Sequence, residues 1–165
     1  MPREEQRPVQ QSVLDRLIDN EPYNRGEAPA TRMQSVRALK AAIRRDLEWL
    51  LNSRAIPEPA PKEFEEVRHS LYTYGLSDIS SMSADDPRSR QKLQHMIEQA
   101  IADFEPRLAA IQVSEPASGG PNEARQLRFM IEAVLKLDPT PEQVVFSTVL
   151  NLATGEYAVK GESNA

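Results

Sequence analysis

The sequence has no cysteine among its 165 residues, which excludes a disulfide framework and any metal or redox site built on thiolates. It has only two histidines, His69 and His95, which fall in different predicted elements with no metal-ligand spacing around either. It also lacks a glycine-rich phosphate loop and the G-x-S-x-G motif of serine hydrolases. The sequence therefore predicts no metal and no cofactor.

Long apolar runs are missing as well. No stretch approaches the roughly 18 apolar residues that span a bilayer, so no direct membrane insertion is expected. The first residues, MPREEQRPVQQ, lack the apolar segment of a signal peptide. The net charge of −5 argues against a general phosphate-binding surface, and hence against nucleic acid as a partner. These features predict a cytoplasmic protein whose length suits one domain.

Three segments have the apolar periodicity of helices. A short helix at 12–18 begins with Ser12 as N-cap, and its apolar residues form a buried or docking face. A second helix runs from about residue 34 to 52, and a third begins at the pair Asp86-Pro87 and ends at Phe104. Residues 1–11 are predicted to be a flexible tail and 19–32 a loop. The face of the first helix comprises Val13, Leu14, Leu17 and Ile18.

The second helix also carries a tryptophan and a run of basic residues. Trp49 lies beside the apolar stripe and is predicted to be a core or edge-of-core aromatic. The basic run is interpreted as a solvated helix face rather than a nucleic-acid site, because no aromatic residues are interleaved with it. The run consists of Arg37, Lys40, Arg44 and Arg45.

Strand signals fill most of the second half of the chain. The clearest alternation lies at 127–137, with weaker strand patterns at 67–74, 108–113, 144–152 and 157–160. Residues 55–63 contain three prolines and read as a stiff linker. The order of elements predicts an α+β domain over 12–160, with helices on one face of a mainly antiparallel sheet and a frayed end at 161–165. The inward positions of the clearest strand are Leu127, Phe129, Ile131, Ala133, Leu135 and Leu137.

The residues Phe104 to Leu108 read FEPRL and lie where the third helix gives way to a strand. Pro106 ends the helix, because its ring removes a backbone donor and pushes the preceding residue out of helical geometry. Glu105 and Arg107 therefore flank a fixed corner. They form either an intrachain pair that stabilises the corner or a docking point for a partner.

An acid–base enzyme has little support in these residues. A glycosidase needs two carboxylates about 5–10 Å apart across a cleft, and nothing brings the available ones together. Binding through an exposed sheet edge is the alternative, since unpaired backbone groups recruit another chain's strand. An ordinary protected edge remains equally open. The carboxylates considered are Glu48, Asp78, Asp103 and Glu105.

With these residues in view, the chain resembles TssE, the family of small baseplate subunits of the type VI secretion system. The resemblance covers about residues 12–160, including the two closing strands. The wider family includes the contractile-phage baseplate wedge protein that starts the tail sheath, and it is often labelled lysozyme-like, a name these residues do not support. The matching pieces are SVLDRLID, VRALKAAIRRDLEWLLNSR, SLYTYGLSDIS and DDPRSRQKLQHMIEQAIADFEPRLAAIQV.

This resemblance implies a non-enzymatic structural role. In that family Glu-Pro-Arg is a docking signature, which falls here on Glu105, Pro106 and Arg107. The implied partners are TssF and TssG, which form the wedge core, with TssK attached outside. The fold is expected to resemble the interlocking "handshake" sheet of the sheath subunits TssB and TssC, with 144–152 and 156–160 as edge elements onto which sheath strands are added. Glu105→Ala or Arg107→Ala is expected to preserve folding and abolish co-purification with TssF–TssG.

Three other functions remain open. The same role in a phage tail or another contractile injection particle differs only in the surrounding machine. A peptidoglycan hydrolase is suggested by the lysozyme-like label. An anti-adaptor regulator with this fold would bind a response regulator instead of a baseplate, and the retained FEPRL stretch argues against it.

Overall fold

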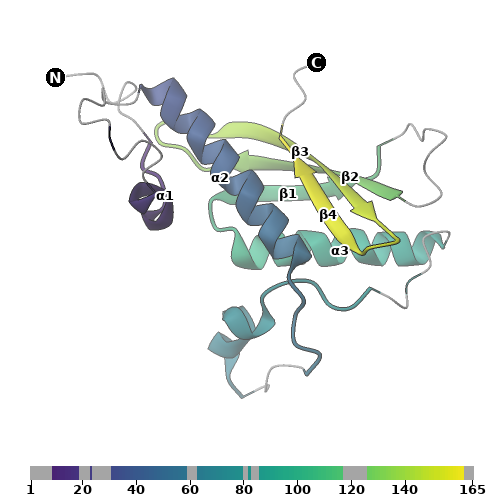
Figure 1. Ribbon diagram of the computed structural model, residues 1–165. Helices are drawn as coiled ribbons and strands as arrows, with labels where there is room; N and C mark the ends of the chain where they lie inside the picture. The colour runs from purple at the N-terminus through teal and green to yellow at the C-terminus, as the bar shows by residue number, and fades with distance from the viewer. Residues whose placement is uncertain are drawn as a thin grey trace.

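The computed structural model describes residues 9–18, 23, 31–58, 63–79, 82, 86–116 and 126–161. Within these ranges, helices α2 (Arg32–Asn52) and α3 (Pro87–Phe104) lie on one face of a four-stranded antiparallel sheet (Figure 1). The short helix α1 (Val13–Leu17) lies beside α2. The predicted α+β fold is confirmed.

Both long helices begin at strong capping signals. Thr31 and Gln34 form a capping box, in which the Gln34 N–H donates to Thr31 Oγ1 (3.3 Å) and the Thr31 N–H donates to Gln34 Oε1 (2.8 Å). Helix α2 therefore begins two residues before the predicted start at 34. Helix α3 starts as predicted, because the Asp86 carboxylate accepts the N–H groups of Arg88 and Ser89.

The sheet has the order β1-β2-β3-β4. Its strands are β1 (Leu108–Ser114), β2 (Gln126–Leu135), β3 (Glu142–Asn151) and β4 (Glu156–Lys160). Strands β2 and β3 pair along their whole length, whereas β4 pairs only with Ser147–Asn151 of β3. Strand β3 therefore lies inside the sheet over half its length and extends beyond β4 over residues 142–146. The prediction that 144–152 forms an edge element is wrong for the half that β4 covers.

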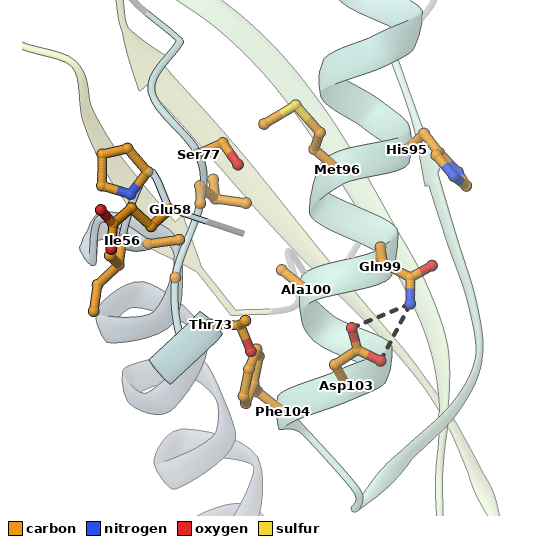
Figure 2. A pocket seen from close by; sticks show the side chains of 14 residues that line it. Ile56, Glu58, Thr73, Ser77, His95, Met96, Gln99, Ala100, Asp103 and Phe104 are labelled. Carbon is orange, nitrogen blue, oxygen red and sulfur yellow. Dashed lines mark hydrogen bonds between the residues drawn. The ribbon is translucent and has the colours of Figure 1, made fainter. Parts of the chain in front are cut away.

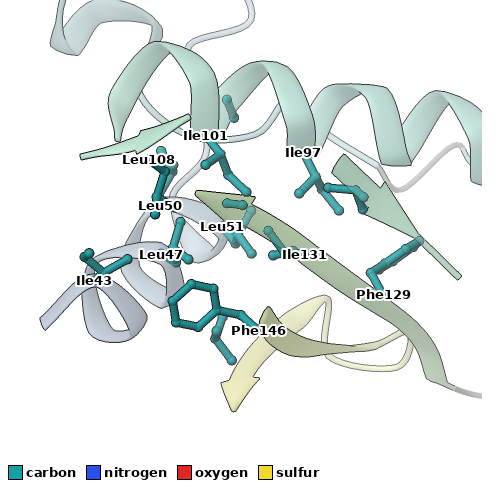
Figure 3. Close-up of a cluster of buried hydrophobic side chains, with 14 of the residues drawn as sticks. Ile43, Leu47, Leu50, Leu51, Ile97, Ile101, Leu108, Phe129, Ile131 and Phe146 are labelled. Carbon is teal, nitrogen blue, oxygen red and sulfur yellow. The ribbon is translucent and has the colours of Figure 1, made fainter. Parts of the chain in front are cut away.

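The core lies between the inward face of the sheet and the two long helices (Figure 3). The alternation predicted for β2 is confirmed: Phe129, Ile131 and the next inward residues are buried, and Leu127 packs partly buried at the margin. The helices meet this face with their apolar stripes. Their fully buried side chains include Ile43, Leu47, Leu51, Ile97 and Ile101.

The strand predicted at 67–74 is wrong. This segment forms two 3₁₀ turns, η2 (Glu65–His69) and η3 (Leu71–Thr73). The Ser70 hydroxyl accepts the Tyr72 N–H (3.2 Å) and donates to the Val67 carbonyl (2.8 Å), which supplies local partners in place of a strand ladder. Leu71 is 84% exposed, so the alternation did not mark a buried face.

The segment after η3 is fastened to the end of α2 at Gly75 and Leu76. The Leu76 N–H donates to Ser53 O (2.9 Å), and the Ala55 N–H donates to Leu76 O (3.0 Å). Leu76 is 1% exposed and belongs to the core. Gly75 has φ +108°, a conformation that glycine adopts without steric cost. These two hydrogen bonds hold the beginning and the end of the segment 53–76 together at the end of α2.

The surface of α2 also differs from expectation. Trp49 is 55% exposed, with the Arg45 guanidinium 5.1 Å from its ring centre, so the core placement is wrong. The basic run lies at the surface as predicted, but three of its four members are bonded elsewhere. Lys40 pairs with Glu142 (2.8 Å), Arg44 donates to a β4 carbonyl, and Arg45 enters an ionic network described below.

Helix α1 has no buried residue, so the buried alternative for its apolar face is wrong, and the docking alternative stays a prediction. The Ser12 cap is confirmed, since its hydroxyl accepts the Asp15 N–H (3.1 Å). The chain already contacts the domain at Val9, whose N–H donates to Ser35 Oγ (2.9 Å). Most of the predicted tail (1–8), of the predicted loop (19–22 and 24–30) and of the frayed end (162–165) lies outside the described residues, as do 59–62 of the linker.

Candidate functional site at the Glu-Pro-Arg corner

The corner predicted from FEPRL is present and is held from both sides. Helix α3 ends at Phe104, and the Glu105 N–H still donates to Ile101 O (2.8 Å). The Leu108 N–H donates to Glu105 O (3.1 Å) as β1 begins. Directly after β2, the N–H of Lys136 donates to Arg107 O (2.9 Å), and its Nζ donates to Pro106 O (2.8 Å). The backbone of the corner is therefore fixed by three elements.

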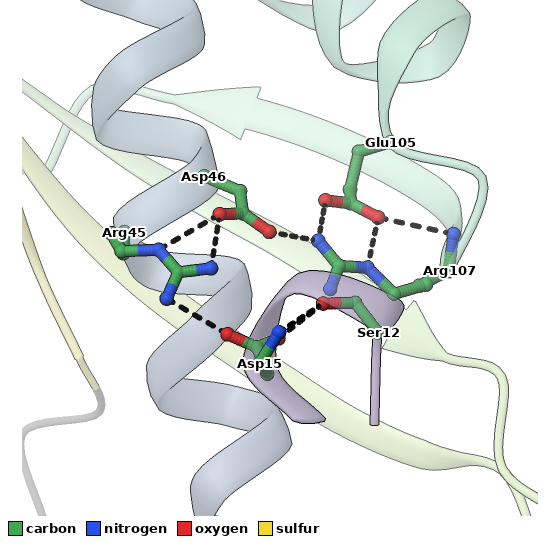
Figure 4. Close-up of polar contacts among 6 residues, drawn as sticks. All are labelled: Ser12, Asp15, Arg45, Asp46, Glu105 and Arg107. Carbon is green, nitrogen blue, oxygen red and sulfur yellow. Dashed lines mark hydrogen bonds and ion pairs between the residues drawn. The ribbon is translucent and has the colours of Figure 1, made fainter. Parts of the chain in front are cut away.

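Glu105 and Arg107 form an intrachain ion pair (Figure 4). Arg107 Nε donates to Glu105 Oε1 (2.6 Å), Arg107 Nη2 donates to Glu105 Oε2, and the Arg107 N–H donates to Oε1 (3.2 Å). Glu105 is only 4% exposed. A buried carboxylate requires such a partner, because an unpaired one would lose its hydration without compensation. This hydrogen bonding is also the main cause of the raised pKa of Arg107.

The pair continues into a row of alternating charges that crosses the domain. Arg107 Nη2 also donates to Asp46 Oδ2 (2.6 Å), and Asp46 Oδ1 accepts Arg45 Nη2 (2.8 Å). Arg45 Nη1 in turn donates to Asp15 Oδ1 (2.8 Å). We call these five residues the ionic row: Asp15, Arg45, Asp46, Arg107 and Glu105. The row joins α1, α2 and the corner, as Figure 4 shows.

Sequence reasoning found only one end of the ionic row. Asp46 lies 61 residues from Arg107, and Asp15 lies 30 residues from Arg45. No local spacing signals such contacts, because they depend on how the helices pack. The available hint was the adjacent Arg45-Asp46 pair on a helix whose other charged residues are basic except Glu48.

One part of the corner remains open to a partner. Pro106 is exposed and the Arg107 side chain is 25% exposed. Among the residues that the structure describes, no acceptor is bonded to Arg107 Nη1. A hollow of about 350 Å³ adjoins the corner. Its lining combines the corner and Asp46 with an apolar wall: Ser12, Asp46, Leu47, Leu50, Tyr74, Phe104, Glu105, Pro106 and Arg107.

Tyr74 and Phe104 stand edge to face across that wall, with ring centres 5.2 Å apart. Burial raises the pKa of Tyr74, and the carboxylates of Asp46 and Glu105 raise it further. The Tyr74 hydroxyl therefore keeps its proton to higher pH than an ordinary tyrosine. With the free guanidinium nitrogen, the hollow can donate hydrogen bonds to carbonyl or carboxylate oxygens.

A larger groove, of about 830 Å³, lies between α3 and the segments 55–58 and 73–77 (Figure 2). Of the four carboxylates considered from the sequence, Asp103 lines this groove, where both its oxygens accept the Gln99 amide (3.1 Å each). Glu105 lines the hollow at the corner instead, and Glu48 and Asp78 line neither cavity. The structure thus does not gather these four carboxylates into one site.

Neither histidine lies in a metal cluster: the described ranges contain no group of three histidine or acidic residues able to hold a metal ion. His69 Nδ1 lies 3.7 Å from Asp103, and His95 Nδ1 lies 3.7 Å from Glu98. Both imidazoles are more than half exposed. Surface pairs of this kind contribute little to stability.

Acid should release helix α1 from the domain. The Ser12 hydroxyl, followed by Arg45, holds the pKa of Asp15 below its usual value of 3.8. A depressed pKa means that the Asp15 contribution is complete above pH 3.8 and is lost as the pH falls through the lower folded-state value. Amide exchange of residues 13–18 should therefore accelerate selectively in acid.

Asp15→Asn should show that faster exchange already at pH 7, because the ion pair to Arg45 is gone. Arg16→Gln is the matched control, since it changes a neighbouring exposed charge outside the ionic row. Equal exchange in wild type and Asp15→Asn at pH 7 would contradict a docking role for this pair.

The fold and site define an α+β domain with two helices on one face of an antiparallel sheet and an ion-paired helix-to-strand corner. The family model described as baseplate wedge protein gp25 matches residues 37–140, more than half the chain. The chain belongs to this baseplate wedge family. A search of curated proteins and a search of solved structures gave no match.

The family supports a structural role in a phage or other contractile baseplate, in assembly with other baseplate proteins. The match covers most of α2, all of α3, the corner, β1 and β2, and it includes all of the ionic row except Asp15. In the part of the chain that the structure describes, no helix is long and apolar enough to cross a membrane.

Proposed function

We propose that the chain acts as a TssE-type subunit of a type VI secretion baseplate. It docks on the TssF–TssG wedge core, within a baseplate that also carries TssK, through Glu105, Pro106 and Arg107. Its sheet then serves as the template on which TssB and TssC begin the contractile sheath. The role is non-enzymatic, needs no cofactor, and is exercised in the cytoplasm at the membrane-docked baseplate.

The observation that carries this proposal is the hydrogen bonding of the Arg107 guanidinium. Glu105 and Asp46 hold its guanidinium in place through Nε and Nη2, while Nη1 has no partner among the described residues. A guanidinium that is already oriented loses little conformational entropy when it binds a partner. Pro106 adds an exposed, rigid ring beside it. The intrachain pair and the docking role are therefore compatible, because the pair positions the nitrogen that remains available.

The test is co-purification of TssF–TssG with Arg107→Lys. Lysine keeps the positive charge beside Glu105 but lacks the planar set of donors that reaches two carboxylates and a partner together. Recovery of TssF–TssG should fall at least tenfold. Arg88→Lys makes the same chemical change at an exposed position in the first turn of α3 and should leave recovery unchanged.

Two results would count against the proposal. Wild-type protein that does not co-purify with TssF–TssG would remove the assigned partner. Full recovery with Arg107→Lys, in a variant whose thermal unfolding shows it to be folded, would remove the assigned docking residue.

A second candidate is the equivalent subunit of a phage tail or another contractile particle. The matched family favours it equally, since its description names a baseplate wedge protein without specifying the machine. Co-expression with the wedge proteins of each machine separates the two, because only the cognate set should be retained. A peptidoglycan hydrolase would instead clear a cell-wall suspension, and loss of that activity on replacing Asp103 in the large groove would identify it.

A further inference from the structure

One side of the sheet has a step in its edge. The last pair between β3 and β4 is Ser147 with Lys160, and β3 continues to Glu142 without β4 beside it. We call β3 residues 142–146, with the adjoining end of β4, the edge step. Nothing within the described part of the chain pairs with this stretch on its β4 side.

The direction of the backbone groups at the edge step follows from the strand pairing. Tyr157 uses both its N–H and its C=O to bond outside the sheet, so its backbone faces away from β3. Because antiparallel ladders alternate every residue, Ser147 and Val149 then face β4. The same alternation turns the N–H and C=O groups of Gln143 and Val145 toward the β4 side, beyond the end of that strand.

Helix α2 covers part of the remaining β4 edge. The Asn52 side chain donates to Tyr157 O (2.8 Å) and accepts the Tyr157 N–H (2.8 Å), as a neighbouring strand would. Arg44 Nη1 donates to Val159 O (3.3 Å). On the opposite edge, Glu98 accepts the Val113 N–H (2.9 Å). Within the described residues, the edge step thus offers two successive outward-facing residues, Gln143 and Val145, whose backbone groups have no partner on the β4 side.

The surroundings of the edge step indicate what it would bind. A recess of about 380 Å³ opens between α2 and this part of the sheet. Its lining includes three cationic residues, Lys40, Arg44 and Lys160, and among the described residues no carboxylate lines it. Lys40 is ion-paired with Glu142 (2.8 Å) at the start of β3. This local excess of positive charge stands out in a chain whose net charge is −5. The remaining lining is apolar or small: Ala41, Val144, Phe146 and Gly161.

We propose that the edge step binds an extended, acidic segment of a partner protein. The segment would pair with the backbone of Gln143 and Val145 as a short strand in line with β4. A side chain on its helix-facing side would enter the recess, where a carboxylate meets the cationic groups of Arg44 and Lys160. This inference rests on the proposed template role of the sheet and specifies where on the sheet a partner strand binds and what chemistry it carries.

Proline at position 143 tests the backbone pairing. The Gln143 N–H faces the β4 side, so Gln143→Pro removes a donor to the partner while the bonds to β2 remain. Gln143→Ala is the matched control, because it removes the same exposed side chain and keeps the N–H. The probe is a labelled heptapeptide of alternating valine and threonine with one central glutamate, followed by fluorescence anisotropy.

Wild type and Gln143→Ala should bind the glutamate peptide alike, and Gln143→Pro at least tenfold more weakly. A peptide with lysine in place of glutamate should also bind at least tenfold more weakly to wild type. Lys160→Glu should weaken binding of the glutamate peptide, whereas Lys92→Glu, the same charge change on α3, should not. Bound peptide should slow amide exchange at Gln143 and Val145.

Several results would overturn the inference. One is that Gln143→Pro and Gln143→Ala bind the glutamate peptide equally well while both variants unfold at the same temperature. Another is that wild type binds the glutamate and lysine peptides equally well. Binding seen only after removal of residues 162–165 would mean that the chain's own end occupies the recess.

The proposed function is judged separately. Gln143→Pro should retain TssF–TssG and lose recruitment of TssB–TssC. If wild-type protein does not co-purify with TssF–TssG, the proposed function is wrong, whatever the result of the peptide-binding experiment.

Discussion

Replacing Arg107 by alanine is expected to lower the free energy of unfolding by about 3 kcal/mol. The side chain is three-quarters buried, and its removal strands the carboxylate of Glu105, which is 4% exposed, and takes one partner from Asp46. Breaking a buried ion pair from one side costs about 3–5 kcal/mol, and the partial exposure of Arg107 places the effect at the low end. Urea unfolding followed by circular dichroism measures it.

A second variant separates the stranded charge from lost packing. In a Glu105→Gln background no buried charge is left behind, so Arg107→Ala should cost markedly less there than in wild type. Equal costs in both backgrounds would show that the ion pair is not the source of the effect. That the alanine variants stay folded remains a prediction. Because Arg107→Ala is also expected to lose stability, Arg107→Lys is the cleaner test of docking.

Replacing Gly75 by alanine should be the other strongly damaging change. At φ +108° a residue with a Cβ is strained, and that Cβ would lie 2.5 Å from Ser53 O, a backbone atom that cannot move aside alone. The Leu76 bonds that close this connection depend on the same geometry. We expect a loss of about 2–3 kcal/mol, seen as a melting temperature about 5–10 °C lower.

Gly155→Ala is the matched comparison. Gly155 also has positive φ, at +71°, but an added Cβ would meet only the end of the Arg54 side chain, at 3.0 Å. That side chain can turn away, so the cost should be the backbone strain alone and clearly smaller. If both alanine variants melt at the same temperature, the contact with Ser53 is not what requires glycine at position 75.

The parts of the fold that follow from short-range periodicity were predictable. The β2 alternation, the Asp86-Pro87 start of α3 and the corner at Pro106 each depend on residues a few positions apart, and each is confirmed. The false strand at 67–74 shows the limit of the same method. Its alternation was short, and the Ser70 hydroxyl supplied a local turn that competed with pairing.

The candidate site was predictable only at its sequence-local end. Glu105 and Arg107 are two residues apart and flank a proline, so their pairing was one of two stated possibilities. The remaining members of the ionic row come from α1 and α2, and which charges meet depends on helix packing that no local pattern encodes. The exposed position of Trp49 has the same origin, because residues beside an apolar stripe fall on either side of the boundary with solvent.

The contact between Asn52 and Tyr157 has a consequence for protein that has not yet been built into a particle. An uncovered strand edge pairs readily with the same edge of an identical copy. Aggregates formed in this way would lower the concentration of free subunits before assembly begins. In this chain Asn52, the last residue of α2, bonds both backbone groups of Tyr157 and so covers the strand edge at that position. The cover is part of the fold and needs no second protein. Pairing of β4 with a second copy should therefore be disfavoured at Tyr157, whereas β3 residues 142–146 of the edge step carry no such cover within the described residues.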